Sequence, residues 1–456
     1  MPRPSLLLSS CLLFVVATAA PPNYEGAIKP LLRQHCLKCH GNDEQESGLN
    51  MQTYAGLVKG GSGGPIVVPG RSNQSLMYQI VTDSDADSRM PPNKPMIPQH
   101  HIDLIQQWID GGLLESADSQ SMVSQRDTSF RPATTTDAKP THPPLPETLP
   151  ELDLPNPIRP LPVLAVATSP WAPLLALSGH EHVRLMNIET QEELGKLPFP
   201  EGVPHVIRFS QDGRVLMVAG GRPVESGSVV LFDIKTGQRL VRIGDELDAV
   251  IAADLSPDQT LVALGGTGKI VKVYSTLTGN ERYQIEKHTD WITALAFSPD
   301  GAKLATADRA GGLHLWDARK GGILLSLLEH QSSVRALDWR ADGKFLASAG
   351  EDGRLIWWDA VDGWPTINKN NAHPPDRPPG AFGTLPNGVL AARFGANGVL
   401  ATTGRDRVVR LWNPQGDPLE TFRYESGFPI SAAITDDGNT VISGGSDGTL
   451  SFWRLK

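Results

Sequence analysis

A short turn motif recurs at a nearly constant interval through the C-terminal part of the chain, and it constrains the fold more than any other feature. Each copy joins an apolar or aromatic residue to a Ser/Pro/Asp/Gly-type turn, and the spacing is roughly 40 residues, which is longer only before the sixth copy. The copies are Ser169–Pro173 (degenerate), Phe209–Gly213, Leu255–Gln259, Phe297–Gly301, Trp339–Gly343, Phe394–Gly398 and Ile434–Gly438. A chain built this way is a repeat architecture in which each unit buries its apolar face against its neighbours.

Each repeat contains short apolar stretches that read as strands. In the fifth copy the turn precedes Leu346–Gly350, and a second tight turn leads to Leu355–Asp359. Short strands at this spacing predict antiparallel four-stranded blades, so seven copies predict an all-β, seven-bladed propeller. The last copy ends at Lys456 after its third strand. We therefore expect residues 151–160 to supply the fourth strand and hide the sheet edge.

The N-terminus has the pattern of a secretory signal peptide. Arg3 gives a positive start, Leu6–Val16 is an apolar run, and Ala17–Ala19 offers small residues for cleavage after Ala19. The run is too short to span a bilayer comfortably, and no other segment is long and apolar enough to do so. We expect residues 1–19 to be removed and the mature chain to be exported, periplasmic or extracytoplasmic, without a membrane span.

The chain has only three cysteines, and Cys11 lies within the signal peptide, so the mature chain keeps Cys36 and Cys39. These form the segment Cys36-Leu-Lys-Cys39-His40. Cys-x-x-Cys on a helical turn places two sulfurs on one face, where they match the two vinyl groups of a haem, and the adjacent His40 is available as an iron ligand. A thioredoxin-type dithiol would follow a strand, a structural zinc site would have four ligands, and a chance match is the third alternative. We interpret the motif as the attachment site of one covalent haem c.

The flanking sequence predicts a small all-α domain. Tyr24–His35 and Gln99–Asp110 carry apolar residues at helical spacing, and Ser75–Val81 predicts a short helix with Leu76 and Ile80 facing inward. Gly111 and Gly112 end the last helix.

Met90, in Arg89-Met-Pro-Pro92, is our candidate for the second iron ligand, because two prolines stiffen the segment and a thioether suits electron transfer. Met51, Met77 and Met96 are competitors, with Met77 expected in the core, and His35, His100 and His101 leave bis-histidine ligation open.

Residues 22–115 resemble the planctomycete-type cytochrome c domain. The resemblance rests on Pro30–Gly41, the Gly60–Gly70 loop, Met90-Pro-Pro and Trp108-Ile-Asp-Gly-Gly. It implies that Cys36, Cys39 and His40 hold haem c and that Met90 is the distal ligand. The Gly60–Gly70 loop lacks the Gly-Lys-Ser/Thr ending of a phosphate loop, so we interpret it as structural.

The repeats resemble the WD-repeat family. That family's hydrogen-bonded set is matched in the fifth copy by His330, Ser348, Asp352 and Trp358. The sixth and seventh copies show no His at the expected place, and the fourth has Ala310 where the Asp is expected. We expect these residues to be structural.

Three local features of the propeller invite a functional interpretation. His180-Glu181-His182 has metal-binding residue types in a predicted turn, although such alternation is more often solvated surface. Insertions at Gly221–Gly227 and Trp364–Asn387 are expected on one face of the ring, either as recognition loops or as tolerated surface insertions.

The sequence thus predicts a multidomain chain: signal peptide 1–19, haem domain 20–117, Pro/Thr-rich linker 118–150 and propeller 151–456. The net charge of −9 argues against a nucleic-acid partner. We expect an electron carrier, more than an enzyme, with redox protein partners and a further protein partner on the propeller. The alternative is a haem-dependent oxidoreductase whose propeller carries a substrate or second-cofactor site.

Overall fold

The computed structural model divides into two compact units, residues 1–125 and 126–456. It describes residues 21–70, 72, 75–85, 88–92, 94–116, 119, 143–152, 160–375, 388–425 and 427–455. The predicted signal peptide lies outside these residues. No helix in the described ranges is long and apolar enough to cross a membrane.

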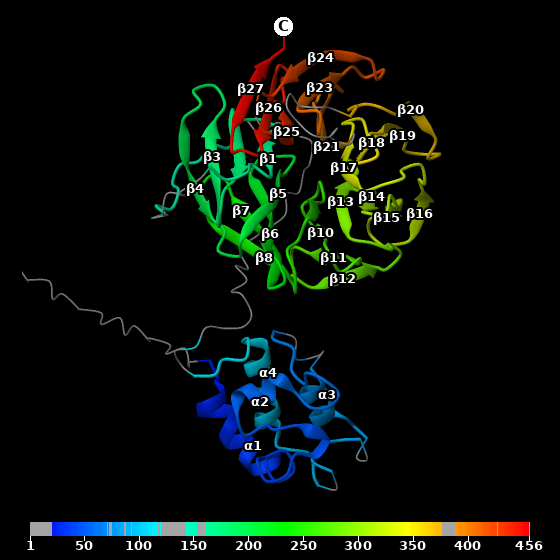
Figure 1. Ribbon diagram of the computed structural model, residues 1–456. Coiled ribbons are helices and arrows are strands. Elements are labelled where there is room, and N and C mark those ends of the chain that lie inside the picture. The colour runs from blue at the N-terminus through cyan, green and yellow to red at the C-terminus, as the bar shows by residue number, and fades with distance from the viewer. Residues whose placement is uncertain are drawn as a thin grey trace, which may run out of the picture. The chain divides into compact units, whose positions relative to one another are not determined.

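The first unit is helical (Figure 1). Its elements are η1 (Tyr24–Ile28), a π-helical turn that continues into α1 (Lys29–His35), the 3-10 turn η2 (Glu46–Gly48), α2 (Tyr54–Lys59), α3 (Leu76–Thr82) and α4 (Gln99–Asp110). The predicted helices are therefore present, and α2 is an addition. Trp108 and Tyr24 are fully buried at the centre, where the Trp108 indole donates to the Leu114 carbonyl and the Tyr24 hydroxyl donates to the Met51 carbonyl.

The predicted inner face of α3 is wrong by one position. Leu76 is 48% exposed, whereas Met77 and Val81 are buried in the helical core, with Ile80 packed at its edge. The buried face runs through Met77 and Val81, which are four residues apart, one position along the helix from the predicted pair. The expectation that Met77 is a core residue is confirmed.

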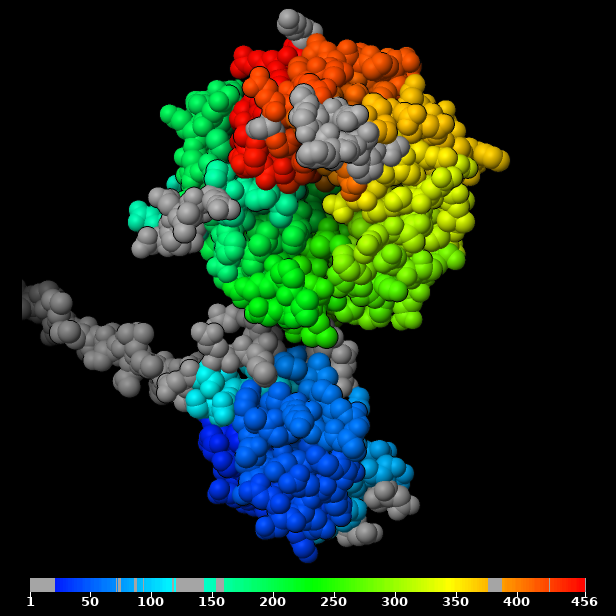
Figure 2. All heavy atoms as spheres, viewed as in Figure 1, coloured from blue at the N-terminus to red at the C-terminus, as the bar shows by residue number. Residues whose placement is uncertain are grey.

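The second unit is a ring of seven sheets, as the repeat count predicted. The chain runs around it from green through yellow to red (Figure 2), so the first and last blades are neighbours. The strands are, blade by blade, β1 (Val166–Thr168), β2 (Leu174–Ser178), β3 (His182–Asn187), β4 (Glu193–Pro198); β5 (Val203–Phe209), β6 (Val215–Arg222), β7 (Ser226–Asp233), β8 (Arg239–Glu246); β9 (Ala252–Leu255), β10 (Leu261–Gly265), β11 (Val271–Ser275), β12 (Glu281–Ile285); β13 (Ile292–Phe297), β14 (Lys303–Asp308), β15 (Leu313–Asp317), β16 (Ile323–Ser326); β17 (Val334–Trp339), β18 (Phe345–Gly350), β19 (Leu355–Asp359), β20 (Pro365–Lys369); β21 (Val389–Phe394), β22 (Leu400–Gly404), β23 (Val408–Trp412), β24 (Pro418–Arg423); and β25 (Pro429–Ile434), β26 (Thr440–Gly445), β27 (Leu450–Arg454).

The recurring turn is held by its own side chains. In the third blade the Ser256 hydroxyl donates to the Asp258 carboxylate over 2.6 Å, and that carboxylate accepts the Thr260 N–H. In the fourth blade the fourth turn residue, Gly301, has φ 68°, a conformation that favours glycine. The Ser/Asp/Gly pattern therefore encodes the reversal between the first two strands of a blade.

The ring closes through hydrogen bonds between the first and last blades. The Thr168 hydroxyl donates to the Ile434 carbonyl, and the Ser431 hydroxyl donates to the Val163 carbonyl, each over 2.7 Å. The last sheet has three strands in the described part of the chain. The predicted fourth strand, residues 151–160, falls mostly outside the described residues, since 153–159 are not among them.

The end of the predicted linker packs on the propeller. We call residues 143–152 the strap. The backbone N–H of Glu147 donates to the Lys235 carbonyl over 2.8 Å, and Leu149 packs on the apolar core shared by the first two blades. Gly195 makes room for this side chain, because a Cβ there would lie 2.5 Å from Leu149 Cδ1.

The predicted set in the fifth blade is confirmed as a buried hydrogen-bond chain. The Trp358 indole donates to Ser348 Oγ (2.8 Å), Ser348 Oγ lies 2.7 Å from His330 Nε2, and His330 Nδ1 lies 3.0 Å from Asp352 Oδ2. Since a carboxylate only accepts, Nδ1 carries the proton and the serine hydroxyl donates to Nε2. These hydrogen bonds join the connection before β17 to β18 and β19, the middle strands of the blade.

The fourth blade has the same chain, which corrects the expectation that its acidic member is missing. Asp308, two residues before Ala310, lies 2.9 Å from His288 Nδ1, and His288 Nε2 lies 2.7 Å from Thr306 Oγ1. The Trp316 indole completes it.

The sixth blade also corrects an expectation. His373 lies 2.8 Å from both Asp406 Oδ1 and Thr402 Oγ1, so the histidine is present inside the predicted insertion 364–387. Part of that insertion, Pro365–Lys369, is strand β20, and 376–387 fall outside the described residues. In the seventh blade the Tyr424 hydroxyl donates to Ser443, where a histidine would otherwise lie.

A buried histidine in the fourth blade predicts acid sensitivity of the propeller. His314 is 6% exposed, and its pKa is lowered to about 4, chiefly by burial and also by His288 and Lys287. The unfolded chain, with an ordinary histidine pKa near 6.5, binds more protons between these values, so stability is lost as pH falls through the window. We expect the change from pH 7 to about pH 4.5 to cost the native protein roughly 2.5 kcal/mol more than the His314→Gln variant.

Urea unfolding of both proteins at the two pH values measures this difference. The exposed His180, changed to Gln, is the control and should retain the native pH dependence. Equal pH dependence of the native and His314→Gln proteins would contradict the assignment.

Candidate haem-attachment site

The segment from Cys36 to His40 forms a tight turn at the end of α1. Cys36 N–H donates to the Leu32 carbonyl over 2.7 Å, and the N–H groups of Cys39 and His40 both donate to the Cys36 carbonyl, over 3.2 and 3.0 Å. The turn brings the two cysteines and His40 together, as the spacing predicted. Both thiols are free and half-buried.

The Cys36 thiol is held in its neutral form. Burial, and to a lesser degree the neighbouring Cys39, raises the pKa of Cys36 to about 12. A thioredoxin-type dithiol needs a nucleophilic cysteine with a lowered pKa, so the environment of Cys36 disfavours that alternative.

His40 is oriented by the loop that follows it. Its Nδ1 lies 3.2 Å from the Glu46 carbonyl, and its own carbonyl accepts the Met51 N–H over 2.8 Å. A carbonyl oxygen only accepts, so Nδ1 carries the proton and Nε2 keeps its lone pair for a ligand. A hydrogen bond of this kind fixes the tautomer and ring orientation of metal-binding histidines.

Met90 lies on a separate segment, which is fastened to α3. Its N–H donates to the Ile80 carbonyl over 2.9 Å, and its side chain is half-buried. The preceding Arg89 donates through Nη1 to the Asp83 carbonyl. The Nε of Arg89 is buried and has no hydrogen-bond partner within the described residues, so it remains available to an anionic group.

The competing ligands are placed differently. Met51 and Met77 are buried in the helical core, and Met96 is 42% exposed. His35 Nε2 lies 3.1 Å from His101 Nδ1, so these two rings contact each other. Burial, with His100 and His35 nearby, lowers the pKa of His101.

The donor set fits a c-type haem better than a free metal ion. Two unbridged thiols, an imidazole with a free Nε2, a half-buried thioether and an unpaired buried guanidinium nitrogen match its vinyl groups, iron and carboxylates. No group of three or more His, Cys, Asp or Glu in the described ranges is arranged to hold a metal ion.

The His180–His182 turn is occupied by its own contacts. The Glu181 carboxylate accepts from Arg222 over 2.7 Å, and His182 Nδ1 lies 2.7 Å from the His180 carbonyl. Arg222 comes from the long hairpin β6–β7, the predicted insertion Gly221–Gly227.

Comparisons with known proteins agree with this division of the chain. Residues 36–94 match the family model described as planctomycete cytochrome C. Residues 279–317, 321–359 and 416–454 match the WD domain, G-beta repeat. Striatin-3 from Bos taurus and from Homo sapiens is 33% identical over a stretch that covers 12% of this chain and 9% of the relative. The chain thus spans less than a tenth of the length of these relatives.

Fold and site together define a protein with a cytochrome c-like domain and a seven-bladed β-propeller. More particularly, its N-terminal domain is of the planctomycete cytochrome c type, and its propeller is built from WD repeats. Both predicted resemblances are confirmed.

Proposed function

We propose that the protein is an exported electron carrier with one covalent haem c, and that its propeller docks a protein partner. The turn that presents Cys36, Cys39 and His40 carries this proposal, because it combines two unbridged thiols with a histidine whose Nε2 is free. The match to planctomycete cytochrome C supports it.

In this proposal the chain contributes the groups that hold and orient the cofactor. Cys36 and Cys39 would hold a haem through thioethers formed by adding their S–H groups across its vinyl groups, His40 Nε2 and the Met90 thioether would ligate the iron, and Arg89 would pair with a haem carboxylate. A haem so bound supplies a single-electron redox centre. The contact between His40 Nδ1 and the Glu46 carbonyl orients the ring with Nε2 directed to a ligand.

We also propose the limits of the parts: a signal peptide ending at Ala19, a haem domain over 20–117 and a propeller over 151–456, preceded by the strap. The WD repeats support a role in protein interaction, and the redox partner is a second protein that meets the haem domain. Ligation by Met90 would favour electron transfer over peroxidase chemistry, which needs an open iron position.

The spectrum and haem content of the purified protein test the proposal. We expect one low-spin haem c per chain with a methionine–iron charge-transfer band. The Met90→Ala variant should lose that band, and its potential should fall by on the order of a hundred millivolts, within the roughly 0.8 V range that axial ligands span. Met96→Ala, which changes an exposed methionine, should retain both properties.

Two results would contradict the proposal. An unchanged band in Met90→Ala would exclude Met90 as the ligand. A high-spin haem or a second cofactor in the native protein would favour the oxidoreductase alternative.

A further inference from the structure

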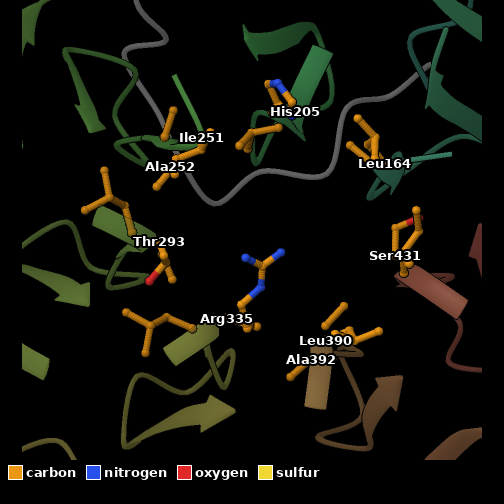
Figure 3. A pocket seen from close by; sticks show the side chains of 18 of the residues that line it. Leu164, His205, Ile251, Ala252, Thr293, Arg335, Leu390, Ala392 and Ser431 are labelled. Carbon is orange, nitrogen blue, oxygen red and sulfur yellow. The ribbon is translucent and has the colours of Figure 1, made fainter. Parts of the chain in front are cut away.

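The axis of the propeller contains a cavity with a volume of about 810 Å³. This is within the range of small-molecule sites. Its walls are the innermost strands of the blades, and its middle layer is one ring of equivalent strand positions (Figure 3). The ring consists of Leu164, His205, Ile251, Thr293, Arg335, Leu390 and Ile430.

This ring has two unlike halves. Leu390, Ile430 and Leu164 come from three consecutive blades around the ring closure and form an apolar wall. The other four positions are mixed: the guanidinium of Arg335 extends into the cavity, and His205, Thr293 and the apolar Ile251 complete the ring (Figure 3). A ligand that satisfies both halves has a charged head and an apolar body.

Two arginines that line the cavity, Arg208 and Arg393, are electrically balanced by nearby carboxylates. Arg208 lies 3.7 Å from Asp254 and 3.6 Å from Asp338, and Arg393 lies 3.6 Å from Asp338. Two cations and two carboxylates therefore offset each other. The Nε of Arg208 is nevertheless buried without a hydrogen-bond partner in the described part of the chain.

The remaining charged side chains that line the cavity carry excess positive charge. Glu351 is the carboxylate that lines this region, and it lies 3.0 Å from Arg405 but 3.8 Å from Arg335. Arg309 lies over the Trp291 ring, 4.9 Å from its centroid, and forms no ion pair with any described residue. The lining residues Arg309 and Arg335 are thus accompanied by one lining carboxylate, Glu351, which lies closer to Arg405 than to Arg335.

The buried hydroxyl of Ser333 is a further donor that favours a ligand with an acceptor group. Ser333 lines the cavity beside Arg335 and is 4% exposed, yet its Oγ has no hydrogen-bond partner among the residues described. A buried hydroxyl without a partner costs free energy unless a ligand or water satisfies it. Ser333, Arg335 and Arg309 together offer donors in excess of acceptors.

We propose that the central cavity binds a small organic carboxylate with an aliphatic body. The carboxylate accepts from Arg335 and Ser333, for which a guanidinium fork is well shaped, and the aliphatic part lies against Leu164, Leu390 and Ile430. The apolar wall disfavours a fully hydrated inorganic anion. All the lining residues belong to the propeller, so this proposal does not rest on the haem.

Calorimetric titration of the purified full-length holoprotein with octanoate tests the proposal. We expect one site per chain, and octanamide, which is similar in size but neutral, should bind at least about tenfold more weakly because charge-assisted hydrogen bonds are lost. Arg335→Gln should weaken octanoate binding to a similar extent. Arg214→Gln, which changes an arginine 60% exposed outside the cavity, should bind as the native protein does.

The Ser333→Ala variant gives a second, independent measurement. It removes a hydroxyl that has no partner in the described structure, so the fold should be retained and octanoate affinity should fall several-fold. Absence of octanoate binding, equal binding of octanamide, or native affinity in Arg335→Gln would overturn the proposal. Sulfate binding as tightly as octanoate would also overturn it, because the cavity would then hold an adventitious ion only.

Discussion

Replacing Cys36 and Cys39 together by alanine is expected to abolish covalent haem attachment. The two thiols are free and lie one turn apart beside His40, and the only other cysteine, Cys11, falls in the predicted signal peptide. A haem without thioether bonds dissociates on denaturation. Haem staining after denaturing electrophoresis should therefore fall from one haem per chain to background.

The single variants and a control make this result specific. Cys36→Ala and Cys39→Ala should each keep at most one thioether, with an absorption maximum shifted by the remaining unreacted vinyl group. Cys11→Ala should stain like the native protein. Staining that persists in the double variant would contradict the attachment site. Loss of staining in Cys11→Ala would show that the assay responds to a defect in export as well as to loss of the attachment residues.

Replacing Asp406 by alanine is expected to produce the largest loss of propeller stability. The carboxylate is 5% exposed and accepts from both His373 and Arg410. Its removal leaves the buried His373 imidazole and the half-buried Arg410 guanidinium, whose Nη1 also lies 2.7 Å from His373 Nδ1, without their carboxylate. Breaking a buried pair in this way costs about 3–5 kcal/mol. Urea unfolding of the propeller measures the difference.

The matched control is Asp245→Ala. The Asp245 side chain is 91% exposed and pairs with Arg242 only over 3.4 Å, so its loss should change stability by less than about 0.5 kcal/mol. A loss below about 1 kcal/mol in Asp406→Ala would show that the buried chain of the sixth blade contributes little.

Local patterns were sufficient for the features that depend on local residues. The Ser/Asp/Gly turn is closed by contacts within five positions, as at Ser256 and Asp258, so its recurrence counts the blades directly. The Cys36–His40 turn is likewise held by neighbours such as Leu32. The sequence alone therefore predicted the ring, and it placed the two cysteines and His40 in one turn.

Features that depend on the length of a connection between blades were missed. His373 lies 33 residues from Asp406, whereas His330 lies 22 residues from Asp352, because the connection into the sixth blade is longer. In the fourth blade the acidic residue is Asp308, which lies two positions before Ala310, where the acidic residue was expected. A search that allowed variable spacing between the His, the Asp and the Ser/Thr and Trp residues of a blade would have found His373 and Asp308.

The central cavity had no local signal at all. Arg335 and Ser333 come from the fifth blade and the apolar wall comes from three other blades, and each residue looks ordinary within its own repeat. Only closure of the ring brings equivalent positions face to face. Alignment of the repeats by strand register would have shown that the positions equivalent to Arg335 are mixed in character.

The strap has a mechanical consequence for the ring. Tension applied to the start of the strap meets Pro144 beside Gly213, then the Glu147–Lys235 hydrogen bond and Leu149, which packs against Gly195. The bonds that join the first and last blades, from Thr168 to Ile434 and from Ser431 to Val163, lie farther along the chain. The strap is therefore expected to protect the ring closure, because a force applied before residue 143 detaches the strap before it reaches the bonds that close the ring.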